Sequence, residues 1–440
     1  MPAKRPIRNR RAPLRSARSA SRYLVALFSA IVVLILPTSG STPDWAGEST
    51  LLTLPRVPWE GGPAYWKQFP AADAAGWSSP DFFPIVAWYN GISSDGEAQY
   101  DKALGINTYI GMDASTPYSL FADNGMYWIG PALNDTFTSG SKNWVGAFLD
   151  DEVDGRYTPE EGRAHLRELS HAAGKDGRFS YANFTQSVLS KDMRPADAEA
   201  YLNDFTDVVS VDMYWYTVPF CSAVPYRENY LAAIPQNGCR SSASYGTALT
   251  MLRERDAADG RLQPLWQFVE DLNGGPGDQP FTANITPAQL EGAVMSSLIG
   301  EARGIVYFNQ SLSGPCQGGS VLRLSQVEQD FCGAGQASAV GRIDALIKQL
   351  APVLNTQSFA YSFGPNLRTM FKVSGDSAYI FSMMGAGTSA GQRSFQLPAG
   401  VTGRAVEVVN ENRTIPVGAG GAFSDSFGSE ADYHVYRVRL

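Results

Sequence analysis

Short apolar runs alternate with stretches of helical periodicity through most of the chain. Eight of these runs have the length and residue types of buried strands. They lie at Phe82–Asn90, Asn107–Asp113, Tyr127–Leu133, Trp144–Glu152, Arg178–Asn183, Val208–Trp215, Pro264–Glu270 and Gly304–Ser311. Helical patterns between them favour parallel strands joined by right-handed crossovers. The pattern therefore predicts an α/β fold, a closed (β/α)8 or TIM barrel, over residues 80–355.

The intervening helices carry recognisable start signals. The clearest follows the fourth strand at Thr158-Pro-Glu-Glu, where Thr158 is the N-cap and Glu161 completes a capping box. Further helices are expected at Gln99–Leu104, Pro195–Phe205, Tyr245–Asp259, Thr286–Arg303 and Gly341–Leu354.

The pattern changes after Asn355, where helical periodicity stops. Short alternating runs separated by Gly-rich turns follow, at Phe359–Ser362, Leu367–Val373, Ala378–Met383, Arg393–Gln396, Ala405–Val408 and His434–Leu440. They predict a small C-terminal antiparallel β-sandwich domain over residues 356–440. Residues 41–79, rich in Pro, Gly and Trp, are expected to pack on the barrel as a lead-in segment. Gly387-Thr-Ser-Ala-Gly391 fits a nucleophile-elbow pattern, but lies between strands and is expected to be a turn.

The N-terminus has the form of an export signal. Eight basic side chains and no acid occupy the first 22 residues, and an apolar run, Tyr23–Leu36, precedes small residues. Residues 1–40 are thus expected to be a signal peptide or an uncleaved signal anchor. The protein is expected to be secreted or held at the cell surface, with membrane contact only through such an anchor.

Loss of that segment would change the net charge from −8 to about −16. Such a surface repels phosphate backbones, which argues against nucleic acid and is compatible with a neutral polysaccharide. The four cysteines of an exported chain indicate disulfides, although four buried free thiols are the alternative. Of three pairings, Cys221–Cys239 and Cys316–Cys332 are favoured because each falls within one loop.

Carboxylates close two of the predicted strands. Glu152 ends the fourth and Glu270 the seventh, so a barrel would bring them to one face. Each has an alternative interpretation: Glu152 lies in an acidic turn, and Glu270 could be a structural carboxylate paired with a base. Histidine is limited to His165, His171 and His434, which weakens a Ser-His-Asp triad or a His-rich metal site.

The acidic run from Asp150 to Gly155 also allows a calcium loop. Asp150, Asp154, Gly155 and Glu161 match positions of an EF-hand pattern, but the entering segment is strand-like and Glu161 is better explained as a capping residue. No metal and no cofactor are therefore expected.

Polar and aromatic residues at other strand ends would line the same face. Asp212 and Tyr214 alternate with apolar residues on the sixth strand, where a buried parallel strand is usually continuously apolar. Flat rings stack on the apolar faces of sugars, and amides hydrogen-bond their hydroxyls. The expected substrate contacts are Asp151, Asp212, Tyr214, Trp88, Asn90, Asn183 and Asn309.

With Glu152 and Glu270 so placed, the chain resembles the (β/α)8 glycoside-hydrolase clan that uses two glutamates, over residues 80–355. The resemblance implies Glu152 as acid/base and Glu270 as nucleophile, about 5–5.5 Å apart in a retaining enzyme. That clan usually has Asn before the acid, where this chain has Asp151, so Asp151 is itself a candidate acid. The resulting hypothesis is an exported retaining glycoside hydrolase acting on a poly- or oligosaccharide. The alternatives are a non-catalytic cell-surface carbohydrate-binding protein on a degenerate barrel and a calcium-stabilised structural protein.

Overall fold

The computed structural model describes residues 53–440, except 90, 175, 225, 227, 228, 276–283 and 315. Met1–Gly47 and Glu48–Leu440 are separate units, and all of the described residues belong to the second. The expected export segment, residues 1–40, lies outside the described residues. No helix in the described part of the chain is long and apolar enough to cross a bilayer.

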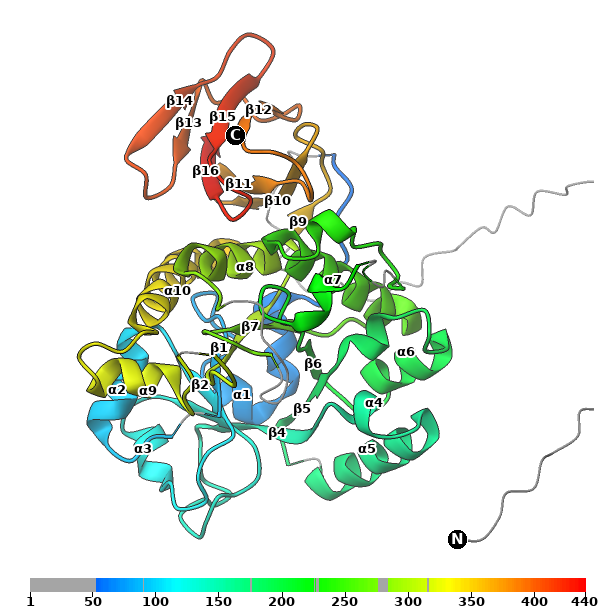
Figure 1. The fold of residues 1–440 in the computed structure, drawn as a ribbon, viewed down its shortest axis with the longest axis vertical. Coiled ribbons are helices and arrows are strands. Elements are labelled where there is room, and N and C mark those ends of the chain that lie inside the picture. The colour runs from blue at the N-terminus through cyan, green and yellow to red at the C-terminus, as the bar shows by residue number, and fades with distance from the viewer. Residues whose placement is uncertain are drawn as a thin grey trace, which may run out of the picture. The chain divides into compact units, whose positions relative to one another are not determined.

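Eight parallel strands form a closed barrel in chain order, as predicted (Figure 1). They are β1 (Ile85–Trp88), β2 (Thr108–Ile110), β3 (Tyr127–Ile129), β4 (Trp144–Asp151), β5 (Phe179–Phe184), β6 (Val208–Val211), β7 (Leu265–Glu270) and β8 (Gly304–Phe308). The barrel closes where β8 pairs with β1. Most strands are shorter than their apolar runs, because residues past the last ladder bonds bend into loops. Asp212 and Tyr214 thus lie just beyond β6.

Helices surround the barrel, and the main ones match the sequence signals (Figure 1). They are α2 (Asp95–Ala103), α3 (Tyr118–Ala122), α4 (Val153–Arg156), α5 (Pro159–Ala173), α6 (Pro195–Asn203), α7 (Ser242–Asp256), α8 (Pro287–Ile299), α9 (Val321–Val327) and α10 (Ala334–Leu354). The Thr158–Glu161 capping box is confirmed at the start of α5. The short helices α3, α4 and α9 were not predicted, since so few residues give no periodicity.

The segment before β1 closes the N-terminal end of the barrel. Its two short helices, η1 (Gly62–Gln68) and α1 (Pro70–Ala74), are followed by the fully buried Trp77. The Trp77 ring contacts Phe179 at the start of β5 and Trp266 at the start of β7, with ring centroids 5.3 and 6.3 Å apart. This end of the barrel is therefore filled by side chains.

An aromatic layer fills the barrel above that plug. The Trp88 ring lies 5.3 Å from Phe148 and 5.1 Å from Phe268, in edge-to-face contacts. Tyr214 packs on Phe268 and Phe308 with centroids 6.4 and 5.0 Å apart. These rings form a rigid apolar floor for whatever lies at the carboxyl ends of the strands.

The C-terminal residues form an antiparallel β domain of two sheets, as predicted. The six-stranded sheet has the order β14 (Arg413–Pro416), β13 (Ala405–Val408), β16 (Tyr433–Arg439), β11 (Ser377–Met384), β10 (Leu367–Ser374) and β9 (Ser358–Phe359). The second pairs β12 (Gly391–Gln396) with β15 (Ala422–Phe427). Phe395 stacks on Phe423, and Tyr436 from the larger sheet packs against both, which makes the domain a sandwich. The segment 386–390 connects β11 to β12 and begins with a turn, as expected.

Both favoured disulfides are present. Cys221 bonds to Cys239 in the loop between β6 and α7, and Cys316 bonds to Cys332 in the segment after β8. Because each closes a loop at the carboxyl ends of the strands, they stiffen the segments that surround the barrel opening.

Candidate active site

The end of β4 carries two acids that face in different directions. The register of β4 against β5 shifts between Phe148 and Asp151, so Asp151 pairs with Asn183. Asp150 instead binds Arg156 and His165, with distances of 2.6 and 2.7 Å. The irregularity therefore sends Asp151 toward the barrel opening and leaves Asp150 in a structural ion pair.

A hydrogen-bond chain connects three adjacent strands at this point. The Asn183 amide donates to Asp151 Oδ1 at 2.9 Å, and Ser210 Oγ donates to Asn183 Oδ1 at 2.6 Å. The Tyr181 hydroxyl lies 2.6 Å from Ser210 Oγ. Burial raises the pKa of Asp151 to about 6, against the Asn183 hydrogen bond, and the charge of Glu152 raises it further. The hydrogen bond with Asn183 therefore holds Asp151 in place, and its carboxyl titrates at about pH 6.

Glu152 and Asp212 form a carboxyl pair. Burial raises the pKa of Asp212 well above its usual value, and the neighbouring charge and hydrogen bond of Glu152 raise it further. A like charge at such close range disfavours ionisation of Asp212. Asp212 Oδ1 is buried and has no hydrogen-bond partner among the described residues. Glu152 itself has a left-handed backbone, with φ of 50°, which turns its side chain out of the β4 line.

Glu270 ends β7 and is fully buried. The Tyr245 hydroxyl donates to its Oε2 at 2.7 Å, and Thr217 Oγ1 donates to its Oε1 at 3.2 Å. Burial raises the pKa of Glu270 to about 7, and these two hydrogen bonds oppose that shift. No lysine or arginine forms an ion pair with it in the described part of the chain, in contrast to the structural-carboxylate interpretation.

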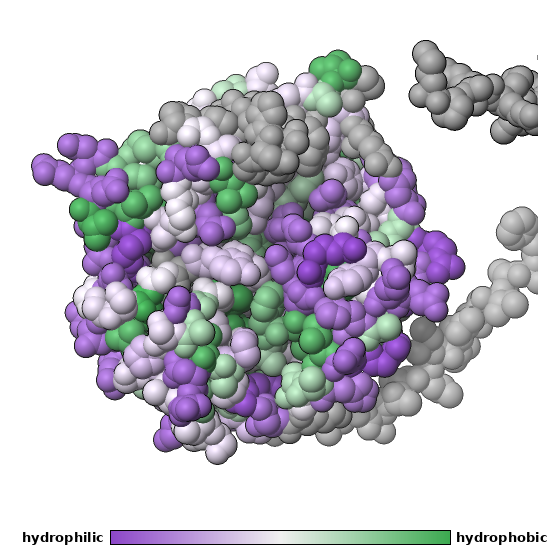
Figure 2. All heavy atoms as spheres, turned by 60° about the horizontal axis from the view of Figure 1, so that its bottom comes forward, coloured by the Kyte–Doolittle hydropathy of each residue, from purple (hydrophilic) through white to green (hydrophobic). Residues whose placement is uncertain are grey.

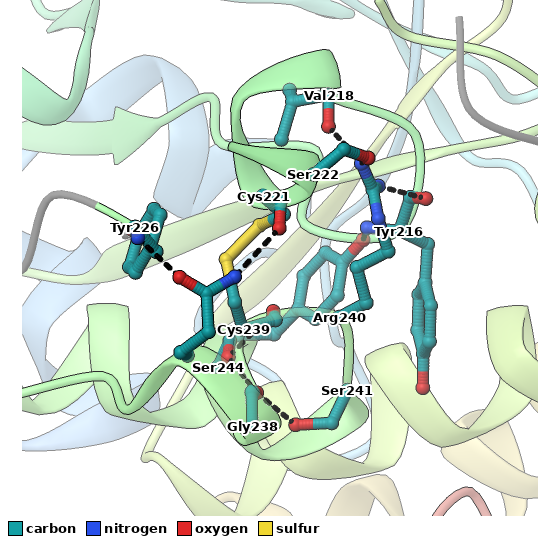
Figure 3. Close-up of a disulfide and its surroundings, with 12 residues drawn as sticks. Tyr216, Val218, Cys221, Ser222, Tyr226, Gly238, Cys239, Arg240, Ser241 and Ser244 are labelled. Atoms are coloured by element: carbon teal, nitrogen blue, oxygen red, sulfur yellow. Dashed lines mark hydrogen bonds between the residues drawn. A yellow bond between two sulfur atoms is a disulfide. The ribbon is translucent and has the colours of Figure 1, made fainter. Parts of the chain in front are cut away.

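The loop that supplies Thr217 is held by Arg240 and the first disulfide (Figure 3). Arg240 follows Cys239, and its guanidinium donates to the carbonyls of Tyr216 and Val218 at 2.6 and 2.7 Å. The residue between these two carbonyls is Thr217, which also accepts the Gly274 amide at 3.2 Å. The loop is therefore locked at the position that contacts Glu270.

Tyr214 lies within electrostatic range of the acids at the ends of β4 and β6 and of Glu270 on β7. Burial raises the pKa of its phenol, and four carboxylates raise it further. In decreasing order of effect these are Asp212, Asp151, Glu270 and Glu152. One side chain is thus within electrostatic range of acids from β4, β6 and β7, which belong to a single acidic site at the carboxyl ends of the strands.

Tyr89 is a part of this site that sequence reasoning did not select. It directly follows β1, has a positive φ of 53° and is 49% exposed, the most exposed aromatic ring in the described chain. Burial and then the charges of Asp151 and Asp150 raise the pKa of its phenol, which places it beside the β4 acids. Figure 2 shows hydrophobic and hydrophilic residues interspersed over one face of the molecule. Tyr89 is distinguished by its exposure together with its positive φ, a combination that is often found at functional sites.

Three other residues were expected to contact the substrate: Trp88, Asn309 and Asn90. Trp88 is 3% exposed and belongs to the aromatic floor. Asn309 is fully buried; its Oδ1 accepts the Leu322 amide at 2.9 Å and its Nδ2 donates to Ser320 Oγ at 3.1 Å. Its amide is therefore already engaged at the start of α9. Asn90 lies outside the described residues.

The acids of the possible calcium loop bind different partners. Asp150 is paired with Arg156 and His165, Asp154 accepts from the Thr185 amide and hydroxyl, and Glu161 caps α5. In the ranges that the structure describes, no group of three potential ligands converges on one point. Each of these three acids therefore makes its own structural contact.

A cavity of about 530 Å³ lies beside the β4 and β6 ends. It is lined by residues that follow β4, β5 and β6, including Asp154, Met193, Tyr226, Asn229 and Tyr230. Asp154 is the acid that it shares with the end of β4, and Glu152, Asp212 and Glu270 are not among its lining residues. Its volume is in the range of small-molecule sites, and its wall combines rings with amide and carboxylate groups.

The burial of Glu270 predicts a pH-dependent cost in stability. Its pKa is about 7 in the folded protein and 4.5 normally. The stability gained by keeping this carboxyl protonated in the fold is therefore fully present below pH 4.5 and is lost as the pH rises through 7. Glu270→Gln stays neutral and should raise the unfolding free energy at pH 8 by roughly 2–3 kcal/mol. Thermal unfolding at pH 8 and pH 4.5 tests this, since the gain in Tm should vanish at the lower pH. An equal gain at both would contradict it.

The fold and this acidic cluster together define the protein as a (β/α)8 barrel with a carboxylate-rich site at the strand ends. Neither a family model nor a curated protein sequence matches the chain. Solved structures with a similar backbone include a GH30 endoxylanase from Clostridium papyrosolvens C71, with 12% identity over 82% of this chain and 97% of that chain and a TM-score of 0.43. The isomaltulose synthase of Klebsiella sp. LX3 has 9% identity over 82% of this chain and 99% of that chain, with a TM-score of 0.46. An Anoxybacillus alpha-amylase has 10% identity over 82% of this chain and 98% of that chain, with a TM-score of 0.42. With such low scores the fold assignment rests on the strand pairing itself.

Proposed function

We propose that the protein is a glycoside hydrolase that cleaves a poly- or oligosaccharide by a retaining mechanism. The observation that carries the proposal is one barrel opening with carboxyls in contrasting environments, above an aromatic floor. Glu270 is buried and anchored by two hydroxyls, whereas Glu152 is partly exposed and paired with Asp212. Glycosidic cleavage needs one fixed nucleophilic carboxylate and one carboxyl that exchanges protons.

In this proposal Glu270 attacks the anomeric carbon while the leaving oxygen receives a proton from Glu152. The hydroxyls of Tyr245 and Thr217 stabilise the ionised nucleophile, which is available above pH about 7. Water then attacks the glycosyl ester, and Glu152 takes its proton, so that the anomeric configuration is retained. Asp212 keeps Glu152 in place by its hydrogen bond, and Asp151 with Asn183 is positioned to bind a sugar hydroxyl.

The surroundings supply binding groups of the kinds that sugars use. Tyr89 and Tyr214 offer rings at the opening, and the 530 Å³ cavity after β4, β5 and β6 would accommodate neighbouring sugar units. Two disulfides are typical of exported proteins, which supports secretion or display at the cell surface. The alternative function is glycan binding without cleavage, which the same rings would support.

Turnover of a glycan panel tests the proposal. Wild-type protein should release reducing sugar from at least one glycan, and Glu152→Gln and Glu270→Gln should release it far more slowly. Proton NMR of the first product should show the anomer of the substrate. Calorimetric glycan binding without any sugar release would favour the binding-protein alternative, and full turnover by both variants would exclude the assignment.

Removal of the exposed ring should weaken substrate binding. Tyr89→Ala is expected to raise KM three- to tenfold with little change in kcat, because a ring contact is worth roughly 0.5–1.5 kcal/mol. Tyr89→Phe should keep near wild-type values, since stacking needs the ring and not the hydroxyl. Steady-state kinetics on the best glycan of the panel measure both, and an unchanged KM in Tyr89→Ala would remove Tyr89 from the substrate contacts.

A further inference from the structure

One carboxylate of the β domain contacts the loop after β6 and the start of α7 in the barrel domain. Glu430 lies in the loop between β15 and β16, and its Oε1 accepts the Tyr216 hydroxyl at 2.6 Å. Its Oε2 accepts the backbone amide of Ser242, the first residue of α7, at 2.8 Å. Tyr216 and Ser242 are themselves 2.7 Å apart through their hydroxyls. Glu430 thus ties the loop after β6 to the start of α7.

This contact replaces the ordinary cap of α7. Ser241 is at the N-cap position, but its hydroxyl donates to the Gly238 carbonyl and accepts nothing from the helix. The first amides of a helix need acceptors, and a carboxylate is favoured there by the helix dipole. Glu430 supplies that acceptor from a different domain. The first turn of α7 is therefore positioned by the β domain.

The same turn carries the partner of Glu270. Tyr245 is fully buried, and its hydroxyl donates to Glu270 at 2.7 Å while it accepts the Tyr216 amide at 3.3 Å. The Tyr216 and Tyr245 rings are 5.7 Å apart at 31°. A continuous path of contacts thus runs from Glu430 through Tyr216 and Tyr245 to Glu270.

We propose that Glu430 is a positioning residue for the active site, so that the β domain completes the site rather than being an appended module. The inference rests on the proposed function, because it concerns the alignment of Glu270 as nucleophile. Without Glu430 the first turn of α7 and Tyr216 lose a common anchor, and the Tyr245 hydroxyl is less well aimed at Glu270. A misplacement of this kind reduces the rate without removing the substrate site.

Other contacts also hold the domains together, and one of them involves the first turn of α7. Arg368 of β10 donates to the Ala243 carbonyl and to Thr247 Oγ1, both at 2.7 Å. The Tyr433 hydroxyl donates to Glu291 Oε2 of α8 at 3.3 Å. Tyr433→Phe removes one interdomain hydrogen bond elsewhere, which makes it the matched control for Glu430→Gln.

The test compares both variants in the full chain. For Glu430→Gln we expect kcat to fall about tenfold or more, KM to change less than twofold, and the acidic limb of the kcat/KM profile to move to higher pH. That limb reports the ionisation of Glu270, which the Tyr245 hydroxyl favours. Hydrogen exchange should also accelerate in a peptide covering Ser242–Gly246. Tyr433→Phe should leave the rate, the pH profile and that peptide unchanged.

Three results would overturn the proposal. One is wild-type exchange in the Ser242–Gly246 peptide of Glu430→Gln. A second is wild-type kcat and pH profile in that variant, and a third is an equal loss in Tyr433→Phe, which would indicate a general effect of domain docking. If the wild-type protein hydrolyses no glycan, the proposed function fails and the positioning role with it; faster exchange would then still show that Glu430 caps α7.

Discussion

Glu270→Gln is expected to lower kcat by roughly ten-thousand-fold, because removal of a covalent nucleophile eliminates the reaction path instead of weakening a contact. The fold should survive, since the amide oxygen still accepts the Tyr245 hydroxyl, which donates to Glu270 at 2.7 Å. KM or the calorimetric affinity should change little, as the rings and Asp151 remain. Single-turnover and steady-state kinetics on the best glycan of the panel measure the loss.

The control for this variant is Glu168→Gln, on the exposed face of α5. It removes the same charge far from the barrel opening and should retain wild-type kcat. A Glu270→Gln variant that is folded and turns over within tenfold of wild type would mean that Glu270 is a structural carboxylate, as its burial alone would also allow.

The identity of the proton donor is decided by a second pair of variants. Glu152→Gln should reduce kcat about a hundred- to ten-thousand-fold on natural glycans, which have poor leaving groups. It should retain much more activity on aryl glycosides, whose leaving groups need no proton. Asp151→Asn should affect both substrates alike and mainly through KM, because Asp151 is hydrogen-bonded to Asn183 as a binding group.

The reverse pattern would reassign the roles at β4. Asp151 has a pKa of about 6 and faces the opening, so it meets the chemical requirements of an acid as well. If Asp151→Asn shows the dependence on leaving group and Glu152→Gln does not, Asp151 is the acid/base and Glu152 supports it. The kinetic comparison with two leaving groups therefore separates the roles independently of the size of each loss.

The barrel was predictable because strand and helix periodicity repeat eight times along the chain. Positions close to strand ends followed from that count, which is why Asp151, Asn183, Asp212 and Glu270 could be selected as candidates. The direction in which each side chain points was harder to predict from the sequence. The β4 irregularity, which separates Asp150 from Asp151, depends on pairing with β5 and leaves no mark in the local sequence.

The contacts around Glu270 could not be predicted for a related reason. Tyr245 has the pattern of an ordinary helical residue, and Thr217 and Arg240 lie in a long loop. Their relevance arises from tertiary packing between segments that are distant in sequence, as does that of Glu430. A left-handed residue such as Tyr89 also escapes detection, because only its backbone conformation distinguishes it from the buried Trp88 beside it.

The proposed mechanism requires that Glu152 and Glu270 act on one sugar, with Glu270 forming the covalent bond. Covalent trapping tests this requirement: a 2-deoxy-2-fluoro glycoside of the hydrolysed sugar inactivates the protein, and mass spectrometry identifies the labelled peptide. We expect a single label on Glu270, with slower labelling in Glu152→Gln when the leaving group is poor. A label on Glu152 or Asp151, or continued turnover with inversion and no label, would contradict the mechanism.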